Sequence, residues 1–184
     1  MTLRFPKPYA DFVARLRVPC GFVLAAAFAW FSHPDWTSLA CGLPVSLIGL
    51  LVRAWAAGHL AKNRALAASG PYAYTRNPLY LGTLVVAVGL AIASRSVSLA
   101  LLFAAVFVCV YLPVIQLEQQ HLANLFPDYA PYAARVPMLW PRFRGAARKG
   151  GFRPSLYLAN REYQAVLGFA VGVLFLVWKA AAGL

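Results

Sequence analysis

Five apolar runs divide the chain and constrain its fold more than any other feature. They cover residues 18–32, 39–60, 79–93, 97–116 and 164–178. The second and fourth runs reach the roughly 20 residues with which a helix crosses a bilayer, whereas the other three have only about 15 and rely on flanking residues. The runs predict an all-α integral membrane protein with about five transmembrane helices. A count of four, with one run re-entrant, is the alternative.

The composition also indicates a chain embedded in lipid. Of the 184 residues, 61% are hydrophobic, 12% are charged and only 5 are acidic, whereas a soluble domain has about a quarter of its residues charged. Too few polar groups are present to cover a surface that faces water. We therefore expect one membrane domain over residues 1–184, with a surface arm at 1–17, four spans within 18–116, a cytoplasmic helical cap at 117–162 and a last span at 163–184.

The basic residues favour one orientation in the membrane. With a cytoplasmic N-terminus, 14 of the 17 Lys and Arg fall on the cytoplasmic side: Arg4, Lys7, Arg15, Arg17, Lys62, Arg64, Arg76, Arg135, Arg142, Arg144, Arg148, Lys149, Arg153 and Arg161. Only Arg95 and Lys179 fall outside, and Arg53 lies within the second run. Such an excess is typical of cytoplasmic loops, so we expect a bacterial inner-membrane protein with its N-terminus in the cytoplasm. The net charge of +12 then has an explanation other than nucleic-acid binding, which we do not expect.

The three cysteines give no sign of a metal site. Cys20, Cys41 and Cys109 lie inside apolar runs, without CxxC or metal-ligand spacing. We interpret them as small buried hydrophobic residues and expect no bound metal.

A first polar cluster precedes the third run, at residues 69–82. Gly70-Pro71 predicts a turn, and Pro78 suits the first position of the following helix with Asn77 as its N-cap. A helix N-terminus beside Arg76 attracts an anion such as a carboxylate. The alternative is a capped helix start with interfacial tyrosines, which leaves Arg76 unexplained.

A second cluster follows the fourth run, in which Pro113 predicts a kink. Glu118, His121, Leu122 and Leu125 share one helical face. Glu118 lies at the membrane boundary, where it suits a bound cation or a sugar hydroxyl. A solvated boundary charge is the alternative.

A third cluster, at residues 129–141, is rich in aromatic residues and proline. We predict that it forms the cytoplasmic cap over the membrane mouth. Interfacial anchoring by Tyr and Trp is the alternative.

Together the clusters resemble the signature of the isoprenylcysteine carboxyl methyltransferase family, within the phospholipid methyltransferase superfamily. The matching residues are Gly70-Pro71-Tyr72, Arg76-Asn77-Pro78, Tyr80, Gly82, Glu118, Leu122, Phe126, Tyr132, Arg135-Val136-Pro137 and Pro141. Three positions depart from the family pattern. The family usually has His where this chain has Asn77, a pair of Glu where it has Glu118-Gln119, and often Arg where it has Met138. These departures weaken the inference that this chain acts on the same substrate as the eukaryotic members of the family. They also leave open that the chain is a relative that has lost catalysis.

The resemblance implies S-adenosylmethionine as cofactor and a methyl transfer. Arg76 and Glu118 are the predicted catalytic residues. The predicted cofactor-binding residues are Tyr72, Tyr74, Arg76, Asn77, Pro78, Tyr80, Gly82, Glu118 and Gln119. Tyrosine faces and Glu118 suit the sulfonium, whereas Arg76 and the helix start at Pro78 suit the methionine carboxylate.

The predicted acceptor is an amphiphile held in the membrane, either an isoprenylcysteine-like carboxylate or a lipid. Arg53, His59, His121 and Arg135 are the candidate substrate residues, with His121 or Glu118 as the base that an amine or phenol acceptor needs. Arg53 is also within snorkelling reach of the membrane surface. A non-catalytic binding or scaffold protein and a membrane reductase are the alternative functions. Gly168 and Gly172 form a GxxxG helix-contact motif, which leaves the oligomeric state open.

Overall fold

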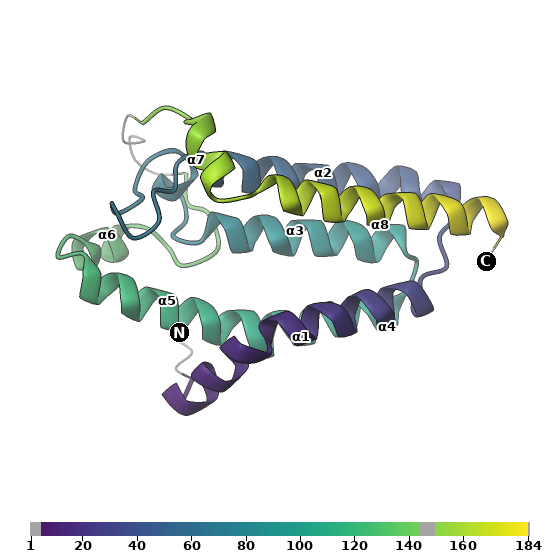
Figure 1. Ribbon diagram of the computed structural model, residues 1–184, viewed down its shortest axis with the longest axis horizontal. Helices are drawn as coiled ribbons and strands as arrows, with labels where there is room; N and C mark the ends of the chain where they lie inside the picture. The colour runs from purple at the N-terminus through teal and green to yellow at the C-terminus, as the bar shows by residue number, and fades with distance from the viewer. Residues whose placement is uncertain (1–4, 144–149, 184) are drawn as a thin grey trace. The chain divides into compact units, whose positions relative to one another are not determined.

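The computed structural model describes residues 5–143 and 150–183, with the side chains of all of these except Arg17 and Val18. Of the predicted cytoplasmic residues, Arg4, Arg144, Arg148 and Lys149 lie outside the described residues. The described part is helical and contains no strand, which confirms the predicted all-α class (Figure 1). It divides into two compact units, one of Met1–Ser46, Ala87–His121 and Gly172–Leu184, and another of Leu47–Val86 and Leu122–Val171.

The apolar runs form the long helices. These are α1 (Lys7–Phe31), α2 (Trp36–Ala57), α3 (Pro78–Ala93), α4 (Val97–Val106) continuing through the π-helical turn Phe107–Tyr111 into α5 (Leu112–Leu125), and α8 (Tyr163–Ala182). Three short helices connect them: the 3₁₀ turn Gly70–Ala73, α6 (Tyr129–Arg135) and α7 (Pro154–Ala159).

The number of membrane spans is three or four in the described part of the chain. Three helices are long and apolar enough to cross a membrane, namely Trp36–Ala57, Val97–Leu125 and Tyr163–Ala182. A fourth is added if the two halves of α1, Lys7–Leu16 and Pro19–Phe31, form one bent span. Helix α3 has 16 residues, about 24 Å at 1.5 Å per residue, which is shorter than the hydrocarbon core. The predicted count of five is therefore not confirmed.

Two helices extend beyond the apolar runs that predicted them. Helix α1 begins at Lys7, inside the predicted surface arm, and α5 continues to Leu125, inside the predicted cap. Apolar composition indicates where a helix meets lipid or core, whereas main-chain hydrogen bonds continue into polar sequence. The cap prediction itself is not tested by these helix boundaries.

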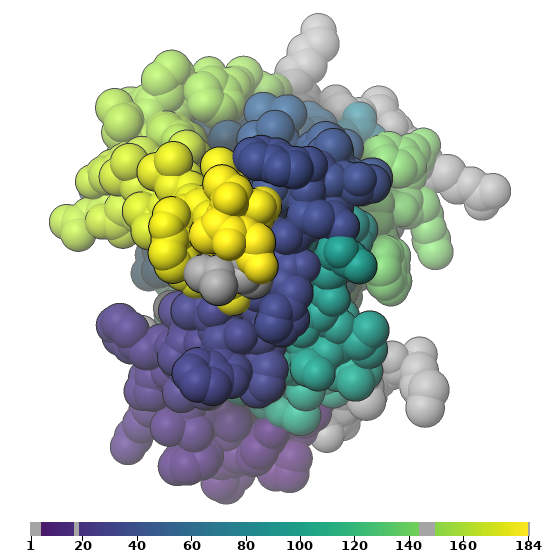
Figure 2. All heavy atoms as spheres, turned by 90° about the vertical axis from the view of Figure 1, so that its right-hand side faces the viewer, coloured from purple at the N-terminus to yellow at the C-terminus, as the bar shows by residue number. Residues whose placement is uncertain are grey.

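The first unit has its core where α1, α2, α3 and α8 meet. Leu39, Ala93 and Leu176 are buried together, and the ammonium group of Lys179 donates to Ser32 O at 2.6 Å. This basic side chain satisfies a carbonyl just past the C-terminus of α1, as helix ends require. Figure 2 looks onto the C-terminal end of α8, drawn in yellow.

Small residues bring α2 and α3 together within the first unit. A Cβ at Gly89 would lie 2.6 Å from Gly42 O, and one at Gly42 would lie 2.5 Å from Ala93 N. The cysteines of this unit differ from the prediction that they are buried, because Cys41 and Cys109 are exposed and Cys20 is half-buried.

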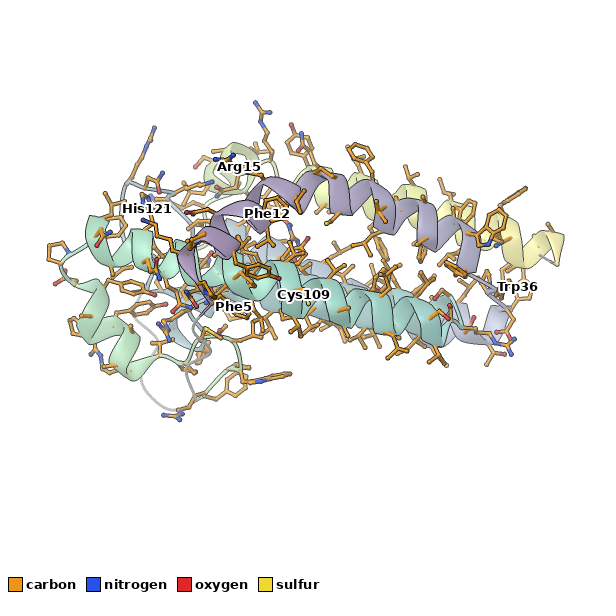
Figure 3. All side chains as sticks on the ribbon, turned by 90° about the horizontal axis from the view of Figure 1, so that it is seen from below. Phe5, Phe12, Arg15, Trp36, Cys109 and His121 are labelled. Atoms are coloured by element: carbon orange, nitrogen blue, oxygen red, sulfur yellow. The ribbon has the colours of Figure 1, made fainter. Side chains whose placement is uncertain are left out.

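The N-terminal arm lies along α4 and α5, also within the first unit. Phe5 N donates to Gln116 Oε1 at 2.8 Å, and Gln116 Nε2 donates to Phe5 O at 2.9 Å. Figure 3 shows Phe5 near Cys109. The side-chain amide of Gln116 thus binds the arm as a main-chain partner would.

The second unit holds the polar ends of several helices. Asn160, just after α7, donates through Nδ2 to Ala57 O at 3.0 Å and Leu60 O at 2.9 Å. These bonds satisfy carbonyls at the C-terminus of α2, where intrahelical donors end. The connections around this end carry most of the residues that the sequence singled out.

Candidate active site

The loop before α3 is shaped by glycine and proline. Gly70 has φ +57°, a backbone conformation that favours glycine, and a Cβ there would lie 2.6 Å from Nε2 of His59. Both the backbone conformation and the lack of space therefore require glycine. Helix α3 begins at Pro78, as predicted, where its fixed φ and missing N–H suit the first helical position. These two elements fix the main chain at either end of the four residues between them, Tyr74 to Asn77.

This loop is bonded to the segment that contains α6. Hydrogen bonds within the second unit join the two segments, among them Tyr132 Oη to Tyr72 O at 2.8 Å, Arg142 N to Tyr74 O at 3.0 Å, Thr75 Oγ1 to Leu139 O at 2.9 Å, Arg76 N to Pro137 O at 2.9 Å, and Asn77 Nδ2 to Met138 O at 2.8 Å. Nearly every residue of the loop is therefore held in place by main-chain groups of its partner. The family resemblance drew on both segments, and the structure brings them together.

Arg76 is held by its side chain as well as its main chain. Its Nη1 donates to Tyr129 Oη at 3.3 Å. Tyr129 and Tyr132 are each only 6% exposed, and their rings meet edge to face at 6.1 Å between centroids. Burial raises the pKa of the Tyr132 phenol well above its usual range, with Tyr129 adding to the effect and Arg76 opposing it. A neutral, buried tyrosine pair thus lies beside one arginine.

Asn77 uses its amide as a donor. It is 7% exposed, and its Nδ2 bond to Met138 reaches the main-chain carbonyl, which is present whatever side chain stands at position 138. The main-chain N–H of Asn77 also donates to Thr75 Oγ1 at 3.3 Å. The two departures from the family at positions 77 and 138 are therefore neighbours in space.

Gly82 and Arg53 are in direct contact. A Cβ at Gly82 would lie 2.5 Å from Cγ of Arg53 and 2.7 Å from Gly49 O, so the absence of a side chain at Gly82 lets the main chain of α2 approach closely. Of the other predicted cofactor-binding residues in and beside this loop, Tyr72 and Pro78 are buried, and Tyr74 and Tyr80 are half-buried.

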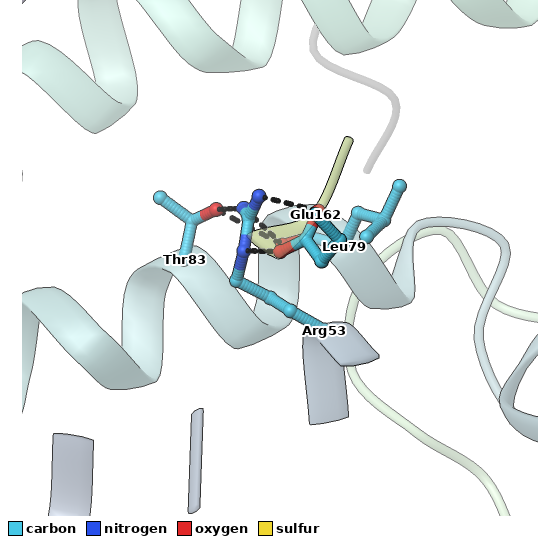
Figure 4. Close-up of polar contacts among 4 residues, drawn as sticks. All are labelled: Arg53, Leu79, Thr83 and Glu162. Atoms are coloured by element: carbon cyan, nitrogen blue, oxygen red, sulfur yellow. Dashed lines mark hydrogen bonds and ion pairs between the residues drawn. The ribbon is translucent and has the colours of Figure 1, made fainter. Parts of the chain in front are cut away.

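Arg53 forms a buried ion pair that the sequence did not reveal (Figure 4). Its Nε donates to Glu162 Oε1 at 2.5 Å and its Nη2 to Glu162 Oε2 at 3.0 Å, while Nη1 donates to Thr83 Oγ1 at 2.5 Å. The side chains of Arg53 and Glu162 are 22% and 8% exposed. This bidentate pair joins α2, α3 and the start of α8, so Arg53 has a defined structural partner. Its predicted role in substrate binding stays a prediction.

His59 lies at the end of α2 among aromatic rings. Its Nδ1 is 2.9 Å from Trp55 O and its Nε2 is 3.1 Å from Gly150 O, so both ring nitrogens face main-chain carbonyls. Trp55 and Phe152 meet the ring edge to face. Arg135, at the end of α6, is exposed and donates through Nε to Pro131 O at 3.1 Å.

Glu118, Gln119 and His121 belong to the first unit, on α5. Glu118 and His121 are exposed and Gln119 is half-buried. The predicted roles of Glu118 and Gln119 in cofactor binding, and of His121 in substrate binding, stay predictions.

Sequence reasoning missed three residues that hold this region together: Tyr129, Thr75 and Glu162. Glu162 had a usable signal, because it is one of only five acids and adjoins an apolar run, and an arginine within a span calls for a partner. Tyr129 and Thr75 had none, since their partners are a distant arginine and a main-chain carbonyl.

In the described residues no three His, Cys, Asp or Glu side chains form a group that could hold a metal ion. The chemical groups gathered in the second unit are instead a guanidinium, tyrosine rings and a helix N-terminus. Such a set suits an anion attached to an organic cation or aromatic group.

Comparison with known proteins identifies the family of the chain, which is a family of membrane methyltransferases. Residues 45–129 match the family described as phospholipid methyltransferase. The chain belongs to the phospholipid methyltransferase family, in its isoprenylcysteine carboxyl methyltransferase-like branch. The matched residues include α3, the loop before it and α5.

Two relatives are named for metal resistance. The cobalt-zinc-cadmium resistance protein CzcN of Cupriavidus metallidurans is 34% identical over 135 residues, which cover 68% of this chain and 62% of that protein. The nickel-cobalt-cadmium resistance protein NccN of Alcaligenes xylosoxydans xylosoxydans is 34% identical over 150 residues, covering 74% of this chain and 70% of that protein. The match thus spans less than two thirds of CzcN. No solved structure matches the chain.

Proposed function

We propose that this protein is an S-adenosylmethionine-dependent methyltransferase whose acceptor is an amphiphile embedded in the membrane. Family membership and the apolar helices support the class of enzyme and its membrane setting. The observation that carries the proposal is Arg76, fixed through main chain and side chain immediately before the N-terminus of α3.

The residues present fit the charges of this cofactor. The Arg76 guanidinium and the α3 N-terminus suit a carboxylate, and the rings of Tyr72, Tyr74 and Tyr80 suit a sulfonium. In this proposal Glu118, Gln119 and Asn77 contact the ribose and adenine, as the family resemblance implies. Pro78 and Gly82 shape the main chain on which these contacts depend.

S-adenosylmethionine supplies an activated methyl carbon, so the protein's task is alignment and the exclusion of water. Holding two reactants in line can contribute about 7–11 kcal/mol to lowering the barrier. The bonds between the 72–77 loop and the 129–142 segment keep the loop rigid enough for such alignment. A carboxylate acceptor needs orientation, for which Arg76 serves, whereas an amine or phenol needs a base, and His121 or Glu118 is proposed for it.

The membrane setting proposed here is the bacterial inner membrane, with the N-terminus in the cytoplasm. The distribution of Lys and Arg supports this orientation. In this orientation the basic polar segments would face the cytoplasm, where S-adenosylmethionine is made available. The acceptor, an isoprenylcysteine-like carboxylate or a lipid, would then reach the site from the bilayer, and Arg53, His59 and Arg135 remain proposed substrate residues.

Cofactor binding by the purified protein in lipid nanodiscs tests the proposal. We expect a dissociation constant for S-adenosylmethionine in the micromolar range, roughly −8 kcal/mol. Arg76→Ala and Glu118→Ala should each weaken binding by about 1.5–3 kcal/mol, because each removes a charged partner. Unchanged binding in both variants, with the fold intact, would place the site elsewhere. Wild-type protein that does not bind at all would favour the non-catalytic alternative, which the departures at Asn77 and Gln119 also support.

A second, compatible proposal concerns biological role. Both relatives are named for resistance to cobalt and cadmium, so we propose that methylation by this chain contributes to tolerance of these ions. Growth of a deletion strain in cobalt should be restored by the wild-type gene but not by Arg76→Ala. Equal restoration by both would separate metal tolerance from the methyltransferase site.

A further inference from the structure

One contact in the second unit bears on how the proposed site works. Arg76 Nη1 donates to Tyr129 Oη at 3.3 Å, although the two residues are 53 positions apart in the sequence. We propose that Tyr129 is a positioning residue, which orients the Arg76 guanidinium toward the carboxylate of the cofactor. This inference rests on the proposed function, and it assigns a role to a residue that the sequence pattern alone left as a possible membrane anchor.

Tyr129 is built as a rigid support. It is the first residue of α6 and is 6% exposed, and its ring packs edge to face against Tyr132. Tyr132 in turn donates to Tyr72 O at 2.8 Å, back in the loop that carries Arg76. Tyr129 and Arg76 are therefore linked in two ways: directly by their hydrogen bond, and through Tyr132, which packs on Tyr129 and bonds to the loop that carries Arg76.

Orientation matters because arginine has a long side chain with many rotamers, and fixing these before the ligand arrives lowers the entropy lost on binding. The main-chain bond from Arg76 N to Pro137 O, at 2.9 Å, fixes where the side chain starts. The bond to Tyr129 fixes the end that carries the charge. Together they preorganise the guanidinium.

A tyrosine suits this task better than an acid. A carboxylate in its place would hold the guanidinium more strongly but would cancel its positive charge. A phenol is neutral at pH 7, so it accepts the hydrogen bond while the charge of Arg76 stays available to attract a ligand anion.

Two ligands that differ in the amino-acid moiety test the inference. S-adenosylhomocysteine carries the carboxylate, whereas 5′-methylthioadenosine keeps the adenosine and the sulfur but lacks it. Affinities are measured by isothermal titration calorimetry in nanodiscs for the wild type, Tyr129→Phe and Arg76→Ala. Tyr163→Phe is the matched control, since it removes the same oxygen from an exposed tyrosine at the start of α8.

We expect Tyr129→Phe to weaken S-adenosylhomocysteine by about 3- to 10-fold, the usual effect of one hydrogen bond, and to leave methylthioadenosine unchanged. In the Arg76→Ala background the same substitution should have no further effect. Tyr163→Phe should bind both ligands as the wild type does. Binding of methylthioadenosine also reports that each variant is folded.

Other outcomes overturn the inference in distinguishable ways. Wild-type affinity in Tyr129→Phe would exclude the positioning role, and an equal loss for both ligands would make Tyr129 a purely structural residue. Wild-type protein that binds neither ligand would overturn the proposed function itself. If Tyr129→Phe does not fold, Tyr129→His, which keeps a ring with an acceptor nitrogen, is compared instead: selective loss for S-adenosylhomocysteine smaller than that of Arg76→Ala supports the role, and no selectivity overturns it.

Discussion

Tyr9 donates its hydroxyl to the main-chain carbonyl of Cys109 at 2.8 Å. Cys109 lies in the π-helical turn Phe107–Tyr111, and its carbonyl is four residues before Pro113. Proline has no N–H to donate to that carbonyl, so the N-terminal arm provides the missing donor. A π-helical turn thus directly precedes the residues around Pro113, and one of its carbonyls has a hydrogen bond from outside the helix; the predicted kink stays a prediction.

This relationship predicts a thermodynamic coupling between Tyr9 and Pro113. Tyr9→Phe should lower the free energy of unfolding by about 0.5–1.5 kcal/mol, because it leaves a carbonyl without its donor. Pro113→Ala restores an N–H, so the cost of Tyr9→Phe should shrink in that background. Thermal unfolding of the four proteins in detergent measures the cycle. Additive effects of the two substitutions would show that the residues act independently.

The Arg53–Glu162 pair predicts a large penalty for removing one charge. Arg53→Met or Glu162→Met alone leaves an uncompensated charge in a mostly buried place, which typically costs about 3–5 kcal/mol. The double substitution should recover most of that loss, because no charge is then left. Fluorescence-detected size-exclusion chromatography after heating gives the ranking. If the double variant is as unstable as the singles, the pair has a role beyond charge compensation.

Two glycines in apolar helices should respond oppositely to alanine. Gly89→Ala places a Cβ 2.6 Å from Gly42 O, and such overpacking costs typically about 1–3 kcal/mol. Gly168 is the matched control, because its added Cβ would meet no described atom within 4 Å apart from its chain neighbours and the backbone of its own helix. Alanine there should be neutral or stabilise by up to about 1 kcal/mol. Thermal unfolding in detergent distinguishes them. Destabilisation by Gly168→Ala would instead indicate that the GxxxG motif packs against a second chain.

The sequence predicted the helices well and their contacts poorly. The run 79–93 became α3 (Pro78–Ala93) and the run 39–60 became α2 (Trp36–Ala57), because apolar length and Pro–Asn punctuation are local signals. Helix α5 continues past the apolar run to Leu125, over the residues for which the sequence predicted one shared helical face, Glu118, His121, Leu122 and Leu125.

The candidate site was predictable in part for the same reason. Arg76 and Pro78 stood out by their local pattern, and α3 starts where that pattern predicts. The bond of Asn77 to Met138 O and that of Thr75 to Leu139 O were not predictable, since main-chain acceptors have no residue identity. The Arg53–Glu162 pair joins positions 109 residues apart, and a single sequence does not encode such pairings by spacing.

The connection between α1 and α2 predicts a pH dependence of stability. Asp35 Oδ1 accepts from Ser38 N at 2.7 Å, while Asp35 N donates to Ser38 Oγ at 3.0 Å, in the manner of a capping box. The main-chain N–H of Ser38, with further contributions from the Ser38 hydroxyl and Arg95, holds the pKa of the Asp35 carboxyl below its usual range. A lowered pKa in the folded state stabilises the protein above the ordinary carboxylate pKa, and this stabilisation is lost as the pH falls through the lowered value.

Asp35→Asn tests that dependence, because asparagine caps a helix as well as aspartate but does not titrate. Below about pH 4, the wild-type unfolding temperature should fall more steeply than that of Asp35→Asn. Near neutral pH the variant should lose only the ion pair with exposed Arg95, a small effect at a surface. Parallel curves for the two proteins between pH 7 and pH 2.5 would contradict the assignment.

The last prediction concerns the acceptor of the proposed methyl transfer. Arg76 and Asn77 directly precede α3, whose first residue Pro78 opens an apolar helix, so the polar groups begin within one turn of the depth at which apolar surface begins. An amphiphile can then place its head group beside Arg76 while its tail stays against apolar side chains, and each methylene that leaves water contributes about 0.8 kcal/mol. Methylation should therefore rise with chain length in a series of acceptors that share one head group, assayed in nanodiscs with radiolabelled S-adenosylmethionine. Arg76→Ala should lose activity with every member of the series, and efficient turnover of a short, freely soluble acceptor by the wild type would exclude entry from the bilayer.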